Sequence, residues 1–345
     1  MQERSFISSF KYFLQGAFIL FLSLLLFFLA GSAYEKSTSR NHVNAFTKQR
    51  FEEYYAQPEN TIDLLFLGSS HSYCTFDPEI FDQALGTNSW QLGTPSQHAD
   101  TSYYVLLNAL QTQAPDTVVM ELYWDVLDDD FEMNQAVSFF EVCNDPNLVE
   151  AYYKEVFPAG EKAKYALPAI RHQQSYFSYR SSRLERAVET NYGLTQPPAA
   201  VANGVEYYQA KGYVYCDIVI PEEEFDATNQ YKNLDGKDWK MSTVQKDYLD
   251  RIVALCQERN IRLLFVTAPI APVSMDYIQN YDLIHDALAS YAESAGVDYV
   301  DLNLVNEQTP FLTYENFRDD AHLNHSGVIK TDQWYLDYLR AKDLI

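Results

Sequence analysis

A serine at the end of a short apolar run is the first residue of this sequence that could do chemistry. Residues 62–67 (IDLLFL) lead directly into Gly68-Ser-Ser-His71. Such a short, bounded apolar run is typical of a strand buried on both faces of a parallel sheet. Ligands bind beyond the carboxyl ends of such strands, so we expect Ser70 at that edge. Its hydroxyl could attack a carbonyl carbon if a base lies within reach.

A histidine near the C-terminus could be that base. His322 follows Asp319 by three residues in the stretch NFRDDAHLNHSG. In a helical turn this spacing places both side chains on one face, where the carboxylate can accept the Nδ1–H of the imidazole. Nε2 is then free to take the proton of a serine hydroxyl. Asp320, only two residues before His322, would point away in that geometry, so Asp319 is the preferred acid.

Alternating strands and helices must bring these residues together. Five short apolar runs are expected as strands, over 62–67, 89–92, 117–122, 261–267 and 297–302. Helices are expected over 78–85, 98–113, 242–259, 281–295 and 325–341. The alternation predicts an α/β fold with a parallel sheet and helices on both faces. The serine and histidine ends of the chain then converge on one rim of the sheet.

These blocks resemble those of the SGNH/GDSL hydrolase superfamily, over most of the chain outside the N-terminal helix and the middle segment. The family's serine falls on Ser70, with Ser69 where the family has Asp, and its final Asp and His fall on Asp319 and His322. The glycine of its second block falls on Gly93. The resemblance implies a flavodoxin-like three-layer sandwich around a parallel sheet of about five strands. It also implies a Ser-His-Asp triad, with the N–H groups of Ser70 and Gly93 as the oxyanion hole.

One block departs from the family pattern. Residues 121–125 (ELYWD) stand where the family has Gly-x-Asn-Asp, so the third oxyanion donor has no counterpart. Tyr123 or Trp124 could supply a substitute. The Gly-Ser-Ser-His and Asp-x-x-His-Leu-Asn blocks look more like the membrane-anchored branch of the superfamily, which includes alginate O-acetylation proteins and the D-alanyl-lipoteichoic acid export protein. Members of that branch often act beside a membrane-bound O-acyltransferase.

Further residues are weaker candidates for the substrate site. His71 either binds substrate or caps the helix that follows Ser70. Tyr123 and Trp124 could line the site, and Glu121 could lie at its rim. Asn324 could also bind substrate, or it could shape the turn that holds the candidate base.

The sequence predicts neither a metal site nor a cofactor. The seven histidines are scattered, and none forms an i, i+4 pair on a helix with a carboxylate partner, so a metal-dependent hydrolase fits poorly. The four cysteines lack C-x-x-C spacing. A disulfide between Cys143 and Cys216 is one pairing that an oxidising compartment would allow.

The N-terminal segment is apolar enough to cross a membrane. Residues 12–34 carry no charge, and Arg4 and Lys11 precede them. We expect residues 1–34 to anchor the chain in the cell membrane by a single pass, with a cytoplasmic N-terminus and an extracytoplasmic main domain. A cleavable signal peptide is the alternative, because Gly31-Ser-Ala33 resembles a cleavage site.

The remaining chain divides by composition. Residues 35–60 are polar and are expected as a stalk, and residues 61–345 as the hydrolase-like domain. An insertion over 128–241 is expected to form a lid or subsite wall, with a hairpin over 206–220. Its tyrosines either pack in the core or offer platforms for sugar rings. The formal net charge of −23 argues against nucleic acid as a partner.

These features predict a membrane-anchored serine esterase or O-acyltransferase that acts outside the cytoplasm. The expected substrates are acyl esters of a cell-surface glycan, with acetyl as the expected acyl group. A membrane-bound O-acyltransferase is the expected protein partner. The alternative is an SGNH domain that has lost its activity and serves as a glycan-binding or assembly factor beside such an enzyme.

Overall fold

The structure is a computed structural model that describes residues 2–38, 45–167, 206–227 and 229–345. The chain divides into two compact units. One unit comprises Val43–Val156 and Glu189–Ile345, and the other comprises Met1–His42 and Phe157–Val188. The first, larger unit contains all the strands described here and all the candidate site residues.

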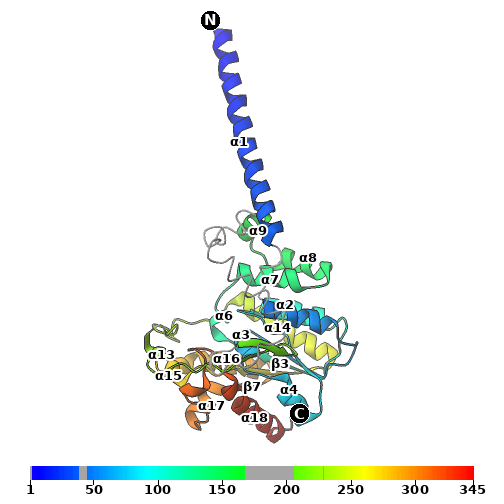
Figure 1. The fold of residues 1–345 in the computed structure, drawn as a ribbon, viewed down its shortest axis with the longest axis vertical. Coiled ribbons are helices and arrows are strands. Elements are labelled where there is room, and N and C mark those ends of the chain that lie inside the picture. The colour runs from blue at the N-terminus through cyan, green and yellow to red at the C-terminus, as the bar shows by residue number, and fades with distance from the viewer. Residues whose placement is uncertain (1, 39–44, 168–205, 228) are drawn as a thin grey trace. The chain divides into compact units, whose positions relative to one another are not determined.

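A five-stranded parallel sheet forms the centre of the larger unit (Figure 1). In spatial order its strands are β2 (Ser89–Gln91), β1 (Leu64–Leu67), β3 (Thr117–Glu121), β6 (Arg262–Thr267) and β7 (Asp298–Asp301). This is the flavodoxin-like order, in which the chain direction across the sheet reverses beside the first strand. The predicted α/β fold with a central parallel sheet is confirmed.

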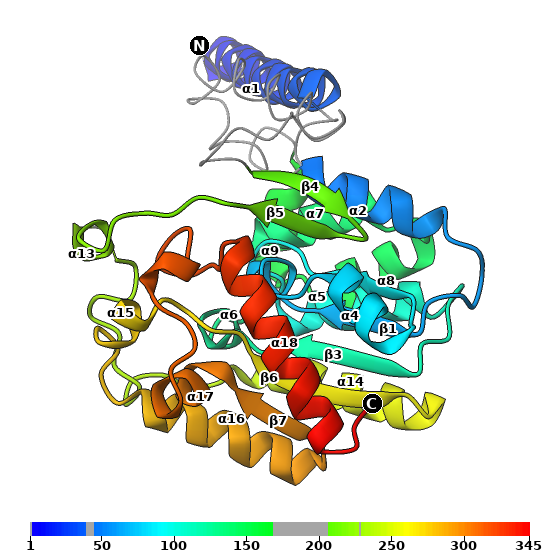
Figure 2. The same ribbon diagram turned by 60° about the horizontal axis from the view of Figure 1, so that its bottom comes forward.

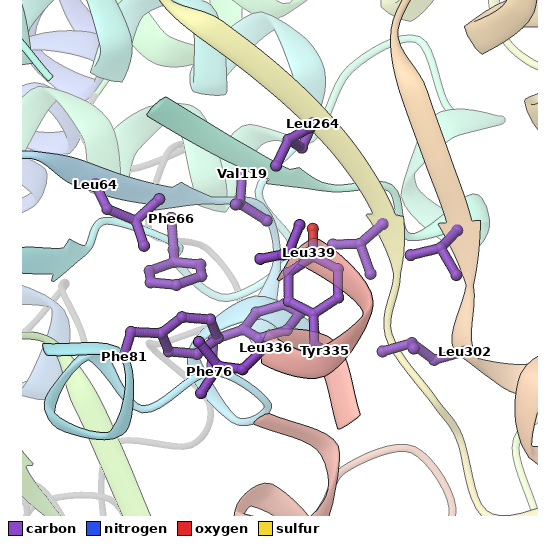
Figure 3. Packing of buried hydrophobic residues seen from close by; sticks show 12 residues of the cluster. Leu64, Phe66, Phe76, Phe81, Val119, Leu264, Leu302, Tyr335, Leu336 and Leu339 are labelled. Carbon is purple, nitrogen blue, oxygen red and sulfur yellow. The ribbon is translucent and has the colours of Figure 1, made fainter. Parts of the chain in front are cut away.

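One face of the sheet is covered by α4 (Pro78–Leu85) and α18 (His325–Ala341). Figure 3 shows this layer, in which Phe66 of β1 points toward Phe81 of α4 and Tyr335 of α18 completes the cluster. The Phe66 and Phe81 rings meet edge to face, with centroids 4.9 Å apart. In Figure 2 α18 runs across the near side of the sheet. The helix that follows the candidate base is therefore fixed to the strand that precedes the candidate nucleophile.

The opposite face is covered by three helices. These are α5 (Ala99–Ala109), α14 (Thr243–Arg259) and α16 (Tyr281–Ala295). α14 contacts both β6 and α5. The Phe265 ring of β6 stacks on Tyr291 of α16, with centroids 6.1 Å apart. The sheet thus lies between two helical layers, as the strand–helix alternation predicts.

Shorter elements connect these layers. They are α3 (Ser70–Tyr73), α6 (Trp124–Leu127), α7 (Met133–Val142), α8 (Pro146–Glu155), α13 (Glu224–Ala227), α15 (Pro272–Met275), α17 (Leu302–Gln308) and a 3₁₀ turn, η1 (Tyr314–Asn316). α3 contacts both β1 and β3, so the segment after the first strand stays at the sheet edge.

An antiparallel hairpin of β4 (Glu206–Ala210) and β5 (Tyr213–Cys216) lies beside the end of β2. At its tip Gly212 has φ 90°, and a Cβ there would lie 2.2 Å from the Gln91 carbonyl oxygen, so only glycine fits. The Gln91 N–H donates to the Lys211 carbonyl at 2.9 Å. The hairpin tip is therefore closely fitted to the main sheet.

Helix α2 (Ala45–Tyr55) lies within the segment expected as a stalk, residues 35–60, yet belongs to the larger unit. Phe51 and Tyr54, three residues apart, give it an apolar face, and both are buried. Arg50, which is fully buried, donates to the Gly212 carbonyl through Nε and Nη2 and to the Gly93 carbonyl through Nη1. The stalk expectation therefore does not hold for the residues of α2.

The smaller unit contains α1 (Gln2–Thr38) and α9 (Ala159–Ala166). Phe10–Ser32 of α1 has a mean hydropathy of 2.4 over a membrane-span window, and none of that window is buried. One apolar helix near the N-terminus thus has the length and composition of a membrane anchor or a signal sequence.

All four cysteines are free thiols. The Cys143 thiol donates to the Asp145 carbonyl at 3.5 Å, and Cys216 is buried in β5. The pairing of Cys143 with Cys216 that the sequence allowed is not formed.

Candidate active site

The turn after β1 places Ser70 at the first position of α3. Gly68 has φ 134°, where side chains are strained, and a Cβ there would lie 2.7 Å from Glu121. Ser69 caps α3, because its hydroxyl accepts the His71 N–H at 3.1 Å. The Ser70 N–H makes no hydrogen bond within the described part of the chain, as is usual in the first turn of a helix. That donor is available to a ligand.

The structure brings Ser70, His322 and Asp319 together. Ser70 Oγ lies 2.8 Å from His322 Nε2, across 252 positions of sequence. His322 Nδ1 lies 3.0 Å from each carboxylate oxygen of Asp319. When Nδ1 donates to this carboxylate, Nε2 carries the lone pair that faces the hydroxyl. This is the arrangement in which an imidazole can remove a serine proton.

A turn closed by the aspartate side chain holds Asp319 beside His322. Asp319 Oδ1 accepts the N–H groups of Ala321 at 2.8 Å and His322 at 2.7 Å. The helical turn expected from the spacing does not form, and α18 begins only at His325. The reason is that an aspartate side chain can satisfy backbone donors that a helix would otherwise use.

Arg318 and His322 keep the Asp319 carboxyl ionised. Burial alone would raise the pKa of Asp319, but the hydrogen bond and charge of His322, then the charge of Arg318, lower it well below its usual range. Arg318 Nε lies 3.8 Å from Asp319 Oδ2, and its Nη1 donates to Glu206 of β4 at 3.0 Å. A carboxylate that stays charged can stabilise an imidazolium formed at His322.

Asp320, the neighbour that the sequence disfavoured, has different partners. Its carboxylate accepts the backbone N–H of Gln230 at 2.7 Å and the Gln230 amide at 3.2 Å. It therefore braces a loop, and within the described ranges it makes no hydrogen bond to the imidazole.

His71 lies next to the triad and is buried. Its ring stacks on Tyr123, with centroids 3.8 Å apart, and lies 4.8 Å from the His322 ring. Burial, then the charge of His322, lower the pKa of His71 well below its usual value. Ser69 is the residue that caps α3, so the capping role considered for the His71 side chain is already filled. A neutral imidazole at position 71 adds no positive charge beside the base.

Tyr123 and Trp124 differ in their access to the site. The Tyr123 hydroxyl lies 3.1 Å from that of Tyr231, and its ring covers His71. The Trp124 side chain is fully buried, and its indole N–H has no partner among the described residues. Trp124 therefore supports Tyr123 from behind, with ring centroids 5.2 Å apart.

Asn324 is a cap and not a free amide. Its Oδ1 accepts the Gly327 N–H of α18 at 3.2 Å and the Ser326 hydroxyl at 2.6 Å. Its Nδ2 donates to the carbonyls of Ile218 and Glu315 at 3.1 and 2.8 Å. With every polar atom engaged, Asn324 shapes the turn that follows His322, which was the second role considered for it.

The N–H of Gly93, the second oxyanion donor expected from the resemblance, is engaged within the protein. It donates to Gln91 Oε1 at 2.8 Å, and the Gln91 amide also exchanges hydrogen bonds with Ser72 at 3.1–3.2 Å. The Gly93 carbonyl accepts from Arg50 at 2.7 Å. Gln91 must turn away before Gly93 can donate to a ligand, so Ser70 is the one expected donor that is open as the site stands.

The sequence suggested Glu121 only for the rim of the site and assigned it no chemical role. Glu121 ends β3, is 2% exposed, and lies under the turn that carries Ser70. Its Oε2 accepts both the N–H and the hydroxyl of Ser69, at 2.9 and 2.8 Å. The sequence held a signal for this contact. Glu121 begins the block that departs from the pattern of the resembled family, and Ser69 stands where that pattern has a carboxylate.

Within the described ranges no group of three or more histidine, cysteine, aspartate or glutamate residues could hold a metal ion. The side chains that meet at the site offer a hydroxyl, an imidazole and a carboxylate.

The chain was compared with known proteins at three levels. No protein-family model matches it, and no curated protein sequence matches it. Among solved structures it is similar to the crystal structure of a "putative acylhydrolase" from Bacteroides fragilis. The two are 9% identical, and the match covers 85% of this chain and 95% of that chain with a TM-score of 0.39.

Proposed function

We propose that the chain is a membrane-anchored serine esterase or O-acyltransferase of the SGNH type. The observation that carries the proposal is the contact of 2.8 Å between Ser70 Oγ and His322 Nε2, with Asp319 on Nδ1. Ser70 would be the nucleophile, His322 the general base and then acid, and Asp319 the residue that orients and stabilises the imidazole.

The reaction begins with attack of Ser70 Oγ on the carbonyl carbon of an ester, while its proton passes to His322 Nε2. Negative charge develops on the carbonyl oxygen, and the Ser70 N–H donates to it. The C–O bond to the alcohol then breaks, and His322 gives its proton to the departing oxygen. The acyl group is now an ester of Ser70. A second hydroxyl, from water or a sugar, loses its proton to His322 and its oxygen bonds to the acyl carbon. The bond from that carbon to Ser70 Oγ then breaks, and His322 returns the proton to Ser70 Oγ.

The proposed substrate is an acyl ester, expected to be acetyl, of a cell-surface glycan. The apolar helix α1 supports a site held at a membrane. Arg4 and Lys11, which precede the apolar run, favour a site outside the cytoplasm, where a membrane-bound O-acyltransferase could supply the acyl group. The partly exposed pair Tyr207 and Tyr215, stacked with centroids 4.9 Å apart on the hairpin next to Arg318, supports an apolar surface for a sugar ring.

The test is Ser70→Ala in the full chain purified in detergent. Labelling by a fluorophosphonate probe and turnover of an acetyl ester should both fall, turnover by about a millionfold. Ser294→Ala, on the remote helix α16, is the matched control and should react like the wild type. Turnover that survives Ser70→Ala would reject the nucleophile. Comparing acetate release with acetyl transfer to an oligosaccharide separates esterase from transferase.

The engaged Gly93 N–H favours a second candidate. A site with one open oxyanion donor and no Gly-x-Asn-Asp block could belong to a domain that binds glycan or assembles with an acyltransferase without catalysing a reaction. Losing one donor costs about a hundredfold or more in rate. A wild-type chain that binds oligosaccharide but never labels with the fluorophosphonate probe would establish this alternative.

A further inference from the structure

Glu121 and Ser69 form a buried pair directly beneath the nucleophile turn. Glu121 Oε2 accepts two hydrogen bonds from Ser69, and the Ser69 hydroxyl in turn accepts the His71 N–H at 3.1 Å. The carboxyl therefore holds the residue before Ser70 directly and the residue after it through one hydroxyl. Both tethers end on the first turn of α3, whose first residue is Ser70.

The shape of the turn is matched to this carboxyl. β1 and β3 pair in parallel with Leu67 opposite Met120, so Glu121 lies beside Gly68. A Cβ at Gly68 would lie 2.7 Å from both Cβ and Oε2 of Glu121. The absence of a side chain at 68 leaves the space that the carboxyl fills. An apolar residue would fill that space without the cost of burying a polar group.

We propose that Glu121 is a positioning residue, which holds the Ser69–Ser70 turn so that the Ser70 hydroxyl faces His322 and the Ser70 N–H stays open. The inference rests on the proposed role of Ser70 as nucleophile. Glu121 touches neither the imidazole nor a reacting atom in this account. It acts through Ser69, by fixing the direction of the turn.

The protonation of Glu121 should be visible in the pH dependence of the reaction. Burial, outweighing the hydrogen bonds from Ser69, raises the pKa of Glu121 to about 7. Tyr123 and Tyr299 are the titratable groups that sense its charge, and burial raises the pKa of each well above its usual value, so both stay neutral. Below neutral pH Glu121 gains a proton, and its carboxyl becomes a weaker acceptor for both Ser69 donors.

The experiment measures the rate of fluorophosphonate labelling of the full chain from pH 5 to 9. Glu121→Ala should label about a hundredfold more slowly, the loss expected when a reacting group is misplaced by about 1 Å. Glu121→Gln keeps an acceptor oxygen without the charge, so it should label faster than Glu121→Ala but more slowly than wild type at pH 8. Wild type should lose labelling rate toward acid pH more steeply than Glu121→Gln, because only wild type loses the charge of Glu121.

Leu288→Ala, which truncates a fully buried residue on α16, is the control that separates a general loss of stability from a loss of labelling rate. This variant should unfold at a lower temperature yet label at the wild-type rate. Wild-type labelling by Glu121→Ala, or the same acid slope in Glu121→Gln and wild type, would overturn the inference and leave the proposed function standing. A wild-type chain that does not label at all overturns both proposals.

Discussion

At the scale of single residues, the adjacent Asp319 and Asp320 contact different partners: Asp319 orients the imidazole, and Asp320 braces a loop. The Asp319 carboxylate contacts the imidazole and accepts two backbone N–H groups, whereas the Asp320 carboxylate accepts the backbone N–H and the side-chain amide of Gln230. The two side chains have the same chemistry and neighbouring positions, and they differ in their partner. Each is therefore the natural control for the other.

We expect Asp319→Asn to lower kcat of acyl ester turnover by about 10⁴-fold, because the amide favours the wrong imidazole tautomer and cannot stabilise the imidazolium. Asp320→Asn keeps an acceptor oxygen for the Gln230 N–H and should retain wild-type kcat. Steady-state kinetics of both variants, with circular dichroism to check folding, decides the matter. Equal losses in the two variants would contradict the assignment of Asp319.

The sequence predicted which residues meet but not how they are held. Ser70, His322 and Asp319 stood out by type and by position relative to strand ends, which depend on chain order alone. The engagement of the Gly93 N–H by Gln91 depends on one side-chain rotamer, which no sequence pattern records. The contact of Glu121 with Ser69 depends on the register between β1 and β3, which sequence reasoning did not set.

At the scale of elements, α18 is fixed to the nucleophile side of the sheet by a buried carboxyl. Asp332 is fully buried on this helix, and its Oδ2 accepts the Asp77 N–H, at the start of α4, at 2.9 Å. Its Oδ1 has no partner among the residues described. Burial raises the pKa of Asp332 well above its usual value. Burial therefore favours the protonated acid at position 332 and outweighs the Asp77 N–H, whose hydrogen bond favours the carboxylate.

A raised carboxyl pKa makes the fold less stable as pH rises. Above a pH of about 4 the unfolded chain releases the Asp332 proton while the folded chain keeps it, so the free energy of unfolding falls until the folded pKa is passed. The free energy of unfolding of Asp332→Asn should therefore match that of wild type at acid pH. As pH rises it should exceed the wild-type value, by about 1.4 kcal/mol per unit of raised pKa.

Urea denaturation of wild type and Asp332→Asn between pH 4 and pH 8 measures this difference. Any destabilisation by the amide itself is independent of pH, so it changes the free energy of unfolding equally at pH 4 and at pH 8. Asp337→Asn, on the exposed side of the same helix with its side chain 66% accessible, should show no such trend. A difference between wild type and Asp332→Asn that stays constant with pH would contradict the buried acid.

Element boundaries were predictable where local signals were strong. The bounds of α4, α16 and α18 agree with the prediction, because Asp77 precedes Pro78 at one start and Gly296 follows at one end. The loop at 319–322 was expected as a helical turn, since spacing alone does not reveal that the aspartate side chain captures the backbone donors. α2 was expected in a stalk because Arg50 and its polar neighbours hid the apolar face of a short helix.

At the scale of the whole molecule, a strongly acidic chain carries one long apolar helix. The net charge of −23 opposes contact with anionic lipid headgroups, so membrane attachment would have to come from α1. Phe10–Ser32, at 23 residues, is long enough to span the hydrocarbon core.

We therefore expect the full chain to stay with the membrane pellet after alkaline carbonate washing, because a spanning helix is held by the hydrophobic effect and not by charge. Intact-mass measurement should recover residues 1–34, and protease added to intact cells should digest the larger unit. A soluble chain that begins near residue 34 would show cleavage of a signal sequence instead. Protection from external protease would contradict the proposed orientation.

The guanidinium of Arg50 has a consequence for anyone who shortens this protein. It reaches from α2 to the Gly93 loop and to the hairpin tip, where its hydrogen bonds within the described ranges go to backbone carbonyls. Its charge is satisfied by backbone carbonyls and by the Tyr73 ring, 4.5 Å from its centre. A truncated protein that lacks the hairpin would leave the buried Arg50 guanidinium without the Gly212 carbonyl. One that starts after residue 60 would lack Arg50 itself and leave the Gly93 and Gly212 carbonyls without their donor. Sensible cloning limits therefore begin before residue 45 and keep residues 206–216.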